Sequence, residues 1–226
     1  MVDRRARLRP KEDGKDYVYG SSEGEEGLLN LLRTTDGMVW PYTPTINQAT
    51  QVDYSSYEPV HSNQEFMAYT RTKAPVITVS GTFTAQNPSE AQYMLACIHF
   101  LRSVTKMDTG LNATQAGTPP PVLLFSAWGQ YMFNDLPVVV TSSTFDFQSD
   151  KDYVKVPDFP EGSPNFQAVS SVGVTEYNDK DQDTWVPAEM LINVTMTVQN
   201  TPTRLTQKFN LKEFKTGSLL TDKGWI

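Results

Sequence analysis

The sequence predicts a mainly β fold: an antiparallel β-sandwich or barrel with one flanking α-helix, at about residues 88–106, and long loops. Three observations lead to this prediction. Several β-branched stretches alternate between apolar and polar residues with a period of two. Only one segment has a long run of apolar residues at helical spacing, and it lies between strands. Charged residues make up only 20% of the chain, while Thr, Ser, Tyr and Phe are abundant, which favours strands over helices.

The central segment is a strand followed by a capped helix. Val76 to Phe83 is β-branched and alternates, with Ile77, Val79 and Phe83 on one face. Asn87 is a predicted N-cap, Pro88 fits the first helical position, and Glu90 can reach back as in a capping box. The predicted apolar stripe then consists of Ala91, Met94, Ile98, Leu101 and Thr105, widened by Leu95 and Cys97, and Asp108-Thr109-Gly110 ends the helix.

The remaining elements are predicted in chain order around this segment. A helical turn is expected at 27–32 and a first strand at 37–42. The bend at 59–63 makes antiparallel pairing of its flanking strands plausible. Met190 to Val198 is the cleanest half-buried strand, because its apolar and other positions alternate strictly. The other predicted strands are 51–57, 65–72, 122–125, 130–133, 138–141, 144–147, 153–156 and 206–211.

The composition divides the chain into three parts. Residues 1–36 form a charged N-terminal arm, which is expected either to order against a partner or to remain a solvated tail. Residues 37–213 form the β domain, interrupted by an insertion loop at about 157–187 with a hairpin expected at 169–176. Residues 214–226 form a C-terminal tail whose apolar residues need a surface to cover.

Charge and composition exclude several classes. The net charge is −7 and no Lys/Arg cluster lies outside the N-terminus, which argues against a nucleic-acid-binding surface. No apolar run approaches the roughly 18 residues that a membrane span needs. No secretory signal is visible, so we expect a soluble protein of a cytosol-like compartment. The single cysteine, Cys97, lies on the predicted helix stripe and is expected to be a buried apolar residue.

The search for catalytic chemistry gives a negative result, which predicts a protein that is not an enzyme and has no cofactor or metal. His61 and His99 have no partner at metal-ligand spacing. Asp179, Asp181 and Asp183 resemble the start of a calcium loop, but Thr184 and Met190 stand where Gly and Glu are required. The carboxylates Asp146, Asp150 and Asp152 are expected to be solvated, and no nucleophile or nucleotide motif is present.

What the sequence does show is aromatic and basic residues near its ends and in its loops. Aromatic residues in irregular segments often anchor interfaces, although they can also cap the domain's own core. The candidate interface residues are Arg4, Arg5, Arg7, Arg9, Trp40, Trp128, Phe214, Trp225 and Ile226.

Several segments of the sequence resemble one family, the structural proteins of contractile-tailed bacteriophages. The similar proteins act in the baseplate hub and lower tail tube, as tube initiators or tube-to-hub adaptors. The resemblance spans about residue 60 to the C-terminus, apart from 157–184. It rests on the strand 74–83, the helix with its Pro88-Ser89-Glu90-Ala91 start and Ile98–Met107 end, the segment Ala116–Leu123, Asp150–Val154, and Trp185-Val186-Pro187 followed by the strand 190–198.

The resemblance implies a tail-tube type of β-sandwich or barrel and a homo-hexameric ring at the tube–hub junction. The partners would be further copies of the chain, the tail tube, and baseplate hub and wedge proteins, without a membrane. Genomic DNA would pass through the ring without specific binding. The protein would be part of the virion, in the tail or baseplate, and would be assembled in the host bacterial cytoplasm.

Three alternatives remain open at this stage. The same kind of ring could be a tail terminator or neck protein at the other end of the tail. A glycan-binding module of the tail belongs to a different class, because β-sandwiches with exposed aromatic residues often bind sugars. A cell-wall hydrolase is the remaining alternative.

Overall fold

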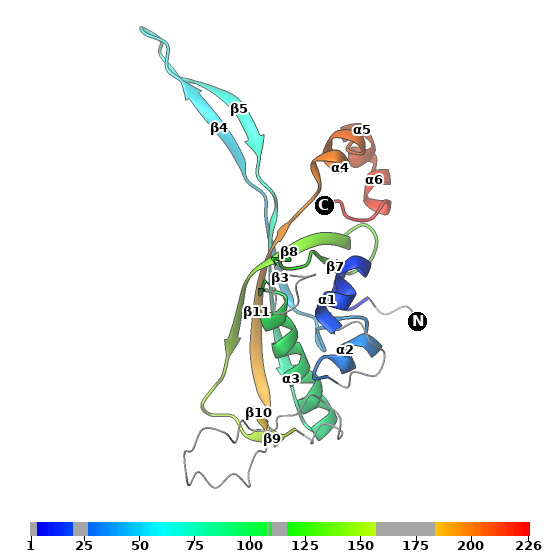
Figure 1. Ribbon diagram of the computed structural model, residues 1–226. Coiled ribbons are helices and arrows are strands. Elements are labelled where there is room, and N and C mark those ends of the chain that lie inside the picture. The colour runs from blue at the N-terminus through cyan, green and yellow to red at the C-terminus, as the bar shows by residue number, and fades with distance from the viewer. Residues whose placement is uncertain (1–3, 20–26, 108, 110–116, 157–183) are drawn as a thin grey trace.

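The computed structural model describes residues 4–19, 27–107, 109, 117–156 and 184–226 (Figure 1). Its centre is a seven-stranded sheet with the order β2-β1-β7-β8-β11-β6-β3, in which all neighbouring strands are antiparallel. These strands are β1 (Arg7–Pro10), β2 (Met38–Val39), β3 (Thr45–Ala49), β6 (Val76–Thr84), β7 (Leu123–Ala127), β8 (Phe133–Asp146) and β11 (Glu189–Val198).

Two small two-stranded sheets and several helices complete the described fold. The small sheets are formed by β4 (Val52–Tyr57) with β5 (Phe66–Thr72), and by β9 (Tyr153–Lys155) with β10 (Trp185–Pro187). The helices are the 3-10 helix η1 (Glu12–Gly14) and the α-helices α1 (Lys15–Tyr19), α2 (Asn30–Thr34), α3 (Pro88–Ser103), α4 (Pro202–Gln207), α5 (Leu211–Thr216) and α6 (Ser218–Thr221).

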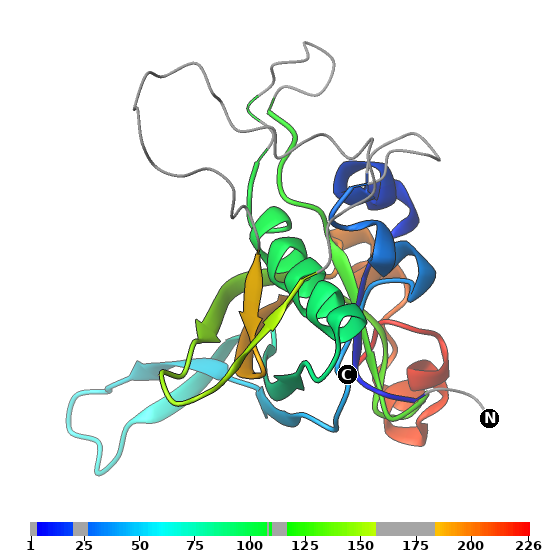
Figure 2. The ribbon, with the colours of Figure 1, turned by 90° about the horizontal axis from the view of Figure 1, so that it is seen from below.

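The core lies between α3 and one face of the main sheet. Figure 2 shows α3 lying across the sheet, with the smaller helices to one side. Residues that face this core are fully or almost fully buried and come from the strands and helix that the sequence predicted best. They include Ile77, Val79 and Phe83 of β6, Met190, Ile192, Val194 and Met196 of β11, and Ala91, Met94, Cys97, Ile98 and Leu101 of α3.

The predicted N-cap of α3 is confirmed in detail. The Asn87 side-chain oxygen accepts a hydrogen bond from the Glu90 N–H at 2.9 Å, and Pro88 occupies the first turn. The Glu90 carboxylate reaches back to the Gln86 N–H at 2.8 Å and to the Asn87 amide at 3.0 Å. The bond from the Glu90 N–H satisfies a donor that the first helical turn leaves without a partner, and such a cap stabilises a helix by about 1 kcal/mol.

The mainly β fold with a flanking helix is confirmed, but the sheet is open and does not close into a barrel. Its two edges, β2 and β3, do not pair with each other. The helix ends at Ser103, earlier than the expected 106. The Thr105 hydroxyl donates to the carbonyl oxygens of Leu101 and Arg102, and such local side-chain bonds favour helix ends.

The N-terminal segment differs from the separate arm that we expected. Residues 7–10 form β1, which pairs with β2 on one side and with β7 on the other. Ala6, Leu8 and Pro10 are buried, and they alternate with arginines that are exposed or half-buried. The segment therefore orders on its own chain, because its period-two pattern buries one face in the core.

The predicted strand at 206–211 is wrong, because this stretch spans the end of α4, a short connection and the start of α5. Thr201 accepts a hydrogen bond from the Arg204 N–H, and Asn210 accepts one from the Lys212 N–H, so each residue caps a short helix. Gly217, at φ 79°, ends α5 and permits the turn into α6. The expected insertion loop ends earlier than 187, since 185–187 form β10, while its 169–176 hairpin lies outside the described residues.

The middle of β6 is occupied by a glycine for a steric reason. The indole ring of Trp40 lies against Gly81, where an added Cβ would come within 2.4 Å of Trp40 Cδ1. Trp40 is fully buried, and its ring meets Phe125 edge-on at a centroid distance of 6.4 Å. The absence of a side chain at Gly81 therefore makes room for the indole ring of Trp40. This ring connects the β1–β2 end of the molecule with the centre of the sheet.

We expect Gly81→Ala to lower the free energy of unfolding by about 1–3 kcal/mol, because the new methyl group overpacks the Trp40 site. Urea unfolding followed by Trp fluorescence measures the change. Ser80→Ala, one residue earlier on the opposite face of the same strand, is the control and should change stability by less than about 0.5 kcal/mol. Equal effects of the two substitutions would contradict the steric explanation.

Candidate functional site

The most prominent feature outside the core is a hairpin that extends beyond the sheet. Strands β4 and β5 continue β3 and β6, since Ala49 pairs with Val76 and the Lys73 N–H donates to the Gln51 carbonyl at 2.9 Å. The chain from β3 to β6 is thus one long hairpin whose first half belongs to the sheet. Figure 1 shows the second half, β4–β5, projecting away from the body.

This projecting hairpin exposes large apolar side chains on both of its faces. Tyr54 lies opposite Tyr69 and Ser56 lies opposite Met67, so these share one face. Tyr57 lies opposite Phe66 on the other face. The exposed fractions of the large side chains are 54% for Tyr54, 67% for Tyr57, 53% for Phe66, 61% for Met67 and 61% for Tyr69.

The hairpin has few contacts of its own that would stabilise it. Asp53 forms ion pairs with Arg71 at 2.9 Å and Lys73 at 3.0 Å, and hydrogen bonds from Lys73 and Arg71 lower the pKa of the Asp53 carboxyl. Exposed ion pairs of this kind contribute little to stability, and an isolated two-stranded hairpin is marginal in water. A surface with this many exposed aromatic groups is typical of a site that another molecule covers.

Sequence reasoning predicted both strands of the hairpin and their antiparallel pairing but missed their role as a surface. The signal was present in the pattern. Tyr54 and Tyr57 lie on opposite faces of β4, and Phe66 and Met67 lie on opposite faces of β5. Neither face of the hairpin is therefore wholly polar. By contrast, a strand that buries one face in the core of its own chain has mainly polar side chains on its other face.

The middle of the main-sheet face opposite α3 is polar and uncharged across four neighbouring strands, and we call this part the neutral face. Two cross-strand rows, read from β8 through β11 and β6 to β3, contain only hydroxyl and amide side chains. None of these residues is buried. The rows are Thr144-Asn193-Ser80-Thr45 and Ser142-Thr195-Thr78-Asn47. This neutral face presents hydrogen-bonding groups without the positive charge that holds nucleic acid phosphates.

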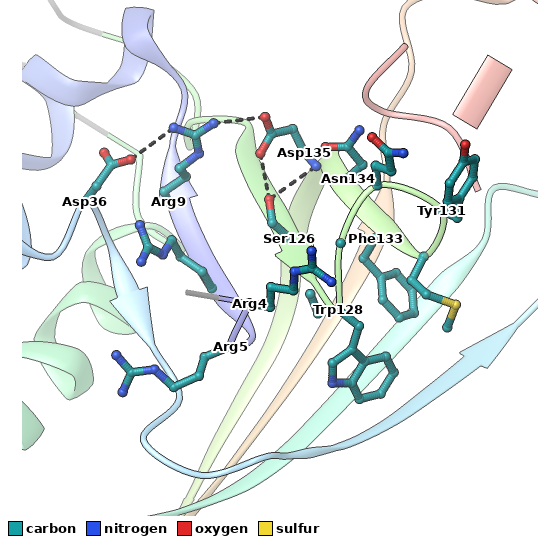
Figure 3. Close-up of a pocket in the computed structure, with 15 residues that line it drawn as sticks. Arg4, Arg5, Arg9, Asp36, Ser126, Trp128, Tyr131, Phe133, Asn134 and Asp135 are labelled. Atoms are coloured by element: carbon teal, nitrogen blue, oxygen red, sulfur yellow. Dashed lines mark hydrogen bonds and ion pairs between the residues drawn. The ribbon is translucent and has the colours of Figure 1, made fainter. Parts of the chain in front are cut away.

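A pocket of about 680 Å³ lies where the chain before β1 meets the turn between β7 and β8 (Figure 3). Its basic side is formed by Arg4, Arg5, Arg7 and Arg9, and its aromatic side includes Trp128, Tyr131 and Phe133. The turn places Trp128 at φ 59°, a left-handed conformation that is unusual for a bulky residue. We call this site the arginine pocket.

Asp135 holds one wall of the arginine pocket together. Its carboxylate accepts hydrogen bonds from Arg9 at 3.0 Å and from Ser126 at 2.6 Å, and Lys223 lies 2.7 Å away. Arg9 also donates to Asp36 at 3.0 Å. Burial by itself raises the pKa of Asp135, but the bonds from Lys223 and Ser126 and the charge of Arg9 outweigh it, so the pKa is lowered. This cluster joins β1, β7, β8 and the C-terminal residues.

Two of the predicted interface residues are part of the chain's own core, which corrects that prediction. Trp40 is 0% exposed and Trp225 is 4% exposed. Trp225 is covered by Arg204, whose guanidinium lies 4.9 Å from the ring centroid, and by Phe209 at 5.7 Å between ring centroids. Trp40 packs against Gly81 and Phe125 of the main sheet, and Trp225 is enclosed by α4 and the residues after it, so both rings cover their own chain, as the alternative interpretation allowed.

The other predicted interface residues are divided between the pocket and the C-terminal helices. Arg4 and Arg5 are exposed and Trp128 is 41% exposed, and all three line the arginine pocket. Arg7 and Arg9 are half-buried, and Arg9 is engaged by Asp36 and Asp135 as described. Phe214 is half-buried with its ring 6.0 Å from that of Phe209, and Ile226 packs partly against the core.

In the described part of the chain, the cysteine, histidine and aspartate side chains singled out in the sequence are buried, half-buried or exposed. Burial raises the pKa of the Cys97 thiol far above its usual range, so the thiol remains protonated. Burial and the charge of Arg102 both lower the pKa of His99, and His61 is exposed in the hairpin turn. Asp146, Asp150 and Asp152 are exposed, and the acidic run 179–183 lies outside the described residues.

Within the described residues, no group of three or more His, Cys, Asp or Glu side chains could hold a metal ion. None of the helices in the described ranges is long and apolar enough to span a bilayer. Comparison of the chain with protein-family models and with curated proteins gives no match. The projecting hairpin, the neutral face and the arginine pocket are therefore the candidate functional surfaces of the described residues.

Replacing Asp135 tests the wall of the pocket. Because the folded-state pKa is lowered, the ionised carboxylate stabilises the fold above its unfolded pKa of about 3.9, and this contribution disappears as pH falls through the folded pKa. Asp135→Asn should lower the free energy of unfolding by about 2 kcal/mol at pH 7 and by much less near pH 2.

Urea unfolding at several pH values from 7 down to 2 measures this difference. The control is Asp16→Asn, which removes an exposed carboxylate from α1. A loss of stability from Asp135→Asn that is the same at pH 7 and at pH 2 would contradict the ionic role of Asp135.

Proposed function

We propose that the chain is a non-enzymatic structural subunit of a contractile bacteriophage tail that forms a hexameric ring at the junction of the tail tube and the baseplate hub. In this role it would help to initiate or anchor the tube and would line the channel for DNA. The observation that carries the proposal is the projecting β4–β5 hairpin, which exposes large apolar side chains on both faces and buries neither face in its own chain.

An open sheet edge supports the same proposal. Strand β3 is the last strand of the main sheet, and β4 continues it along the same side of the long hairpin. Unpaired edge strands pair readily with further chains unless they are protected, for example by charges, bulges or prolines. β3 contains no charged residue and no proline. Edge-to-edge joining of neighbouring copies would satisfy this edge in a ring.

The neutral face suits a channel through which DNA slides. The eight residues of its two rows provide no positive charge to bind phosphate, and the chain as a whole has a net charge of −7. A lumen lined in this way would let the genome pass without being held. We therefore infer that this face turns toward the channel, while α3 lies on the outer side of the ring.

The proposal includes the partners and place that the family resemblance implies. The ring would contact the tail tube on one side and hub and wedge proteins on the other, and it would be assembled in the host bacterial cytoplasm before it becomes part of the virion. A terminator or neck ring at the opposite end of the tail would use the same surfaces. Hexamers that stack on the head connector and not on hub proteins would identify that alternative.

A glycan-binding module of the tail is a second candidate, favoured by the exposed Trp128 and Tyr131 at the arginine pocket. Aromatic rings beside polar groups are common in sugar sites because they combine an apolar surface with hydrogen bonding. Retention on peptidoglycan or polysaccharide resin that is lost in Trp128→Ala would support this candidate. Free passage of the wild-type chain would remove it.

Mass measurement tests the ring directly. We expect the 25.4 kDa chain to be a monomer when dilute and to reach the mass of six copies when concentrated or mixed with tail-tube and hub proteins. Native mass spectrometry gives the mass, and negative-stain electron microscopy shows whether the particles are rings. A single-copy mass under all of these conditions would refute the proposal.

Substitution of the hairpin should separate assembly from folding. Tyr57→Ser should change the free energy of unfolding of the monomer by less than about 0.5 kcal/mol, because the side chain is exposed, yet reduce hexamer formation at least tenfold. Tyr153→Ser is a matched control, since Tyr153 is also 67% exposed but lies on β9. A hexamer yield unchanged by Tyr57→Ser would exclude this residue from the assembly surface.

A further inference from the structure

We propose that the tip of the β4–β5 hairpin in one copy of the chain docks into the arginine pocket of a neighbouring copy. This inference rests on the proposed ring and specifies how neighbouring subunits recognise each other. The tip is defined as residues 57–66, the last cross-strand pair of the hairpin together with the turn that it encloses.

The chemistry of the tip is acidic and aromatic. Tyr57 and Phe66 form the final pair of the hairpin and are 67% and 53% exposed. Glu58 and Glu65 directly follow and precede this pair, and both are exposed. These two carboxylates lie at the opposite end of the hairpin from the ion pairs that Asp53 forms with Arg71 and Lys73.

The chemistry of the pocket is complementary to that of the tip. Arg4, Arg5, Arg7 and Arg9 line one side of it, and Arg9 is held in place by Asp36 and Asp135. Figure 3 shows Arg4 beside the turn that carries Trp128. Trp128, Tyr131 and Met132 are 41%, 60% and 49% exposed on the other side of the pocket. Arginine forms bidentate bonds with carboxylates and stacks on aromatic rings, so this lining suits both features of the tip.

The placement of the two surfaces favours a second copy as the occupant. The hairpin leaves the β3–β6 edge of the main sheet, whereas the pocket lies by β1 and β7, near the β2 edge. In Figures 1 and 2 the hairpin lies on one side of the molecule, and the chain's N-terminal end and C-terminal helices lie on the other. Six residues of strand span about 20 Å, which is long enough to reach across a subunit boundary.

Two different surfaces on opposite sides of a subunit make a heterologous contact. Such a contact repeats head to tail and closes into a ring when the rotation between copies allows it. Each copy in the ring would then give one tip and receive one tip. Because the tip carries carboxylates, the same contact would also neutralise the arginines and keep them from holding DNA.

Charge exchange between the two surfaces tests the docking. Glu58→Arg with Glu65→Arg should reduce the association constant of the ring at least tenfold, and Arg4→Glu with Arg5→Glu should do the same, because each pair places like charges together. A chain that carries all four substitutions restores opposite charges and should recover association to within about threefold of wild type. Sedimentation velocity, under the conditions in which the wild-type chain assembles, measures each constant.

Two controls make the result specific. Asp150→Arg with Asp152→Arg changes the net charge as much as the hairpin pair does, but it affects exposed residues between β8 and β9, and association should stay near wild type. A disulfide trap covers the case in which a charge variant folds poorly. Glu65→Cys in one chain and Gln130→Cys in another should cross-link when mixed under oxidising conditions, while the buried Cys97 stays unreacted.

The outcomes separate this inference from the proposed function. Rings that form equally well in all charge variants would overturn the docking and leave the ring itself in place. A wild-type chain that never forms rings would refute the proposed function. If Arg4→Glu with Arg5→Glu weakens binding of a double-stranded DNA oligomer and leaves self-association unchanged, the pocket binds nucleic acid and the docking proposal is wrong.

Discussion

The packing of α3 against one face of an open antiparallel sheet is the interaction on which the rest of the structure depends. A sheet that buries only one face needs a cover of matching length, and the 16-residue α3 supplies it. Side chains of β6, β11 and α3 are almost fully buried in this contact, and each large one contributes about 1.5–3 kcal/mol relative to exposure. With one face covered by the helix, the other face and the β3 edge remain accessible, whereas Met38 and Val39 of the β2 edge are buried.

This arrangement explains the positions of the surfaces that we propose for assembly. The long β3–β6 hairpin is anchored in the core through Val79 and Ile77, so its distal half can project without unfolding the chain. The terminal segments pack at the opposite side, where Asp135 joins Arg9 to Lys223 and thereby shapes the arginine pocket. A stable centre thus holds a protruding element on one side and a receiving site on the other. Both would serve the repeating subunit that we propose.

The predictions from sequence succeeded where a short, local pattern decides the structure. The Asn87-Pro88-Ser89-Glu90 start fixed the beginning of α3, and strict alternation fixed the buried positions of β6 and β11. They failed where competing patterns were weak. Residues 206–211 were predicted as a strand, and Thr and Phe are good strand formers, yet Thr201, Asn210 and Gly217 supplied helix caps. Trp40 and Trp225 looked like surface anchors because no local pattern shows which chain segment covers an aromatic ring.

The sequence by itself determined the mainly β class, the single long helix, its cap, the strands of the projecting hairpin and the inward faces of the central strands. These depend on the period of side chains along a few neighbouring residues. Only the tertiary structure decided that β1 inserts between β2 and β7, that the sheet stays open, and that arginines before and within β1 meet the turn after β7. The pairing of β1 with β7, such as Arg7 with Ser126, joins residues that are far apart in the sequence, and such contacts depend on the packing of the whole chain and not on any local pattern.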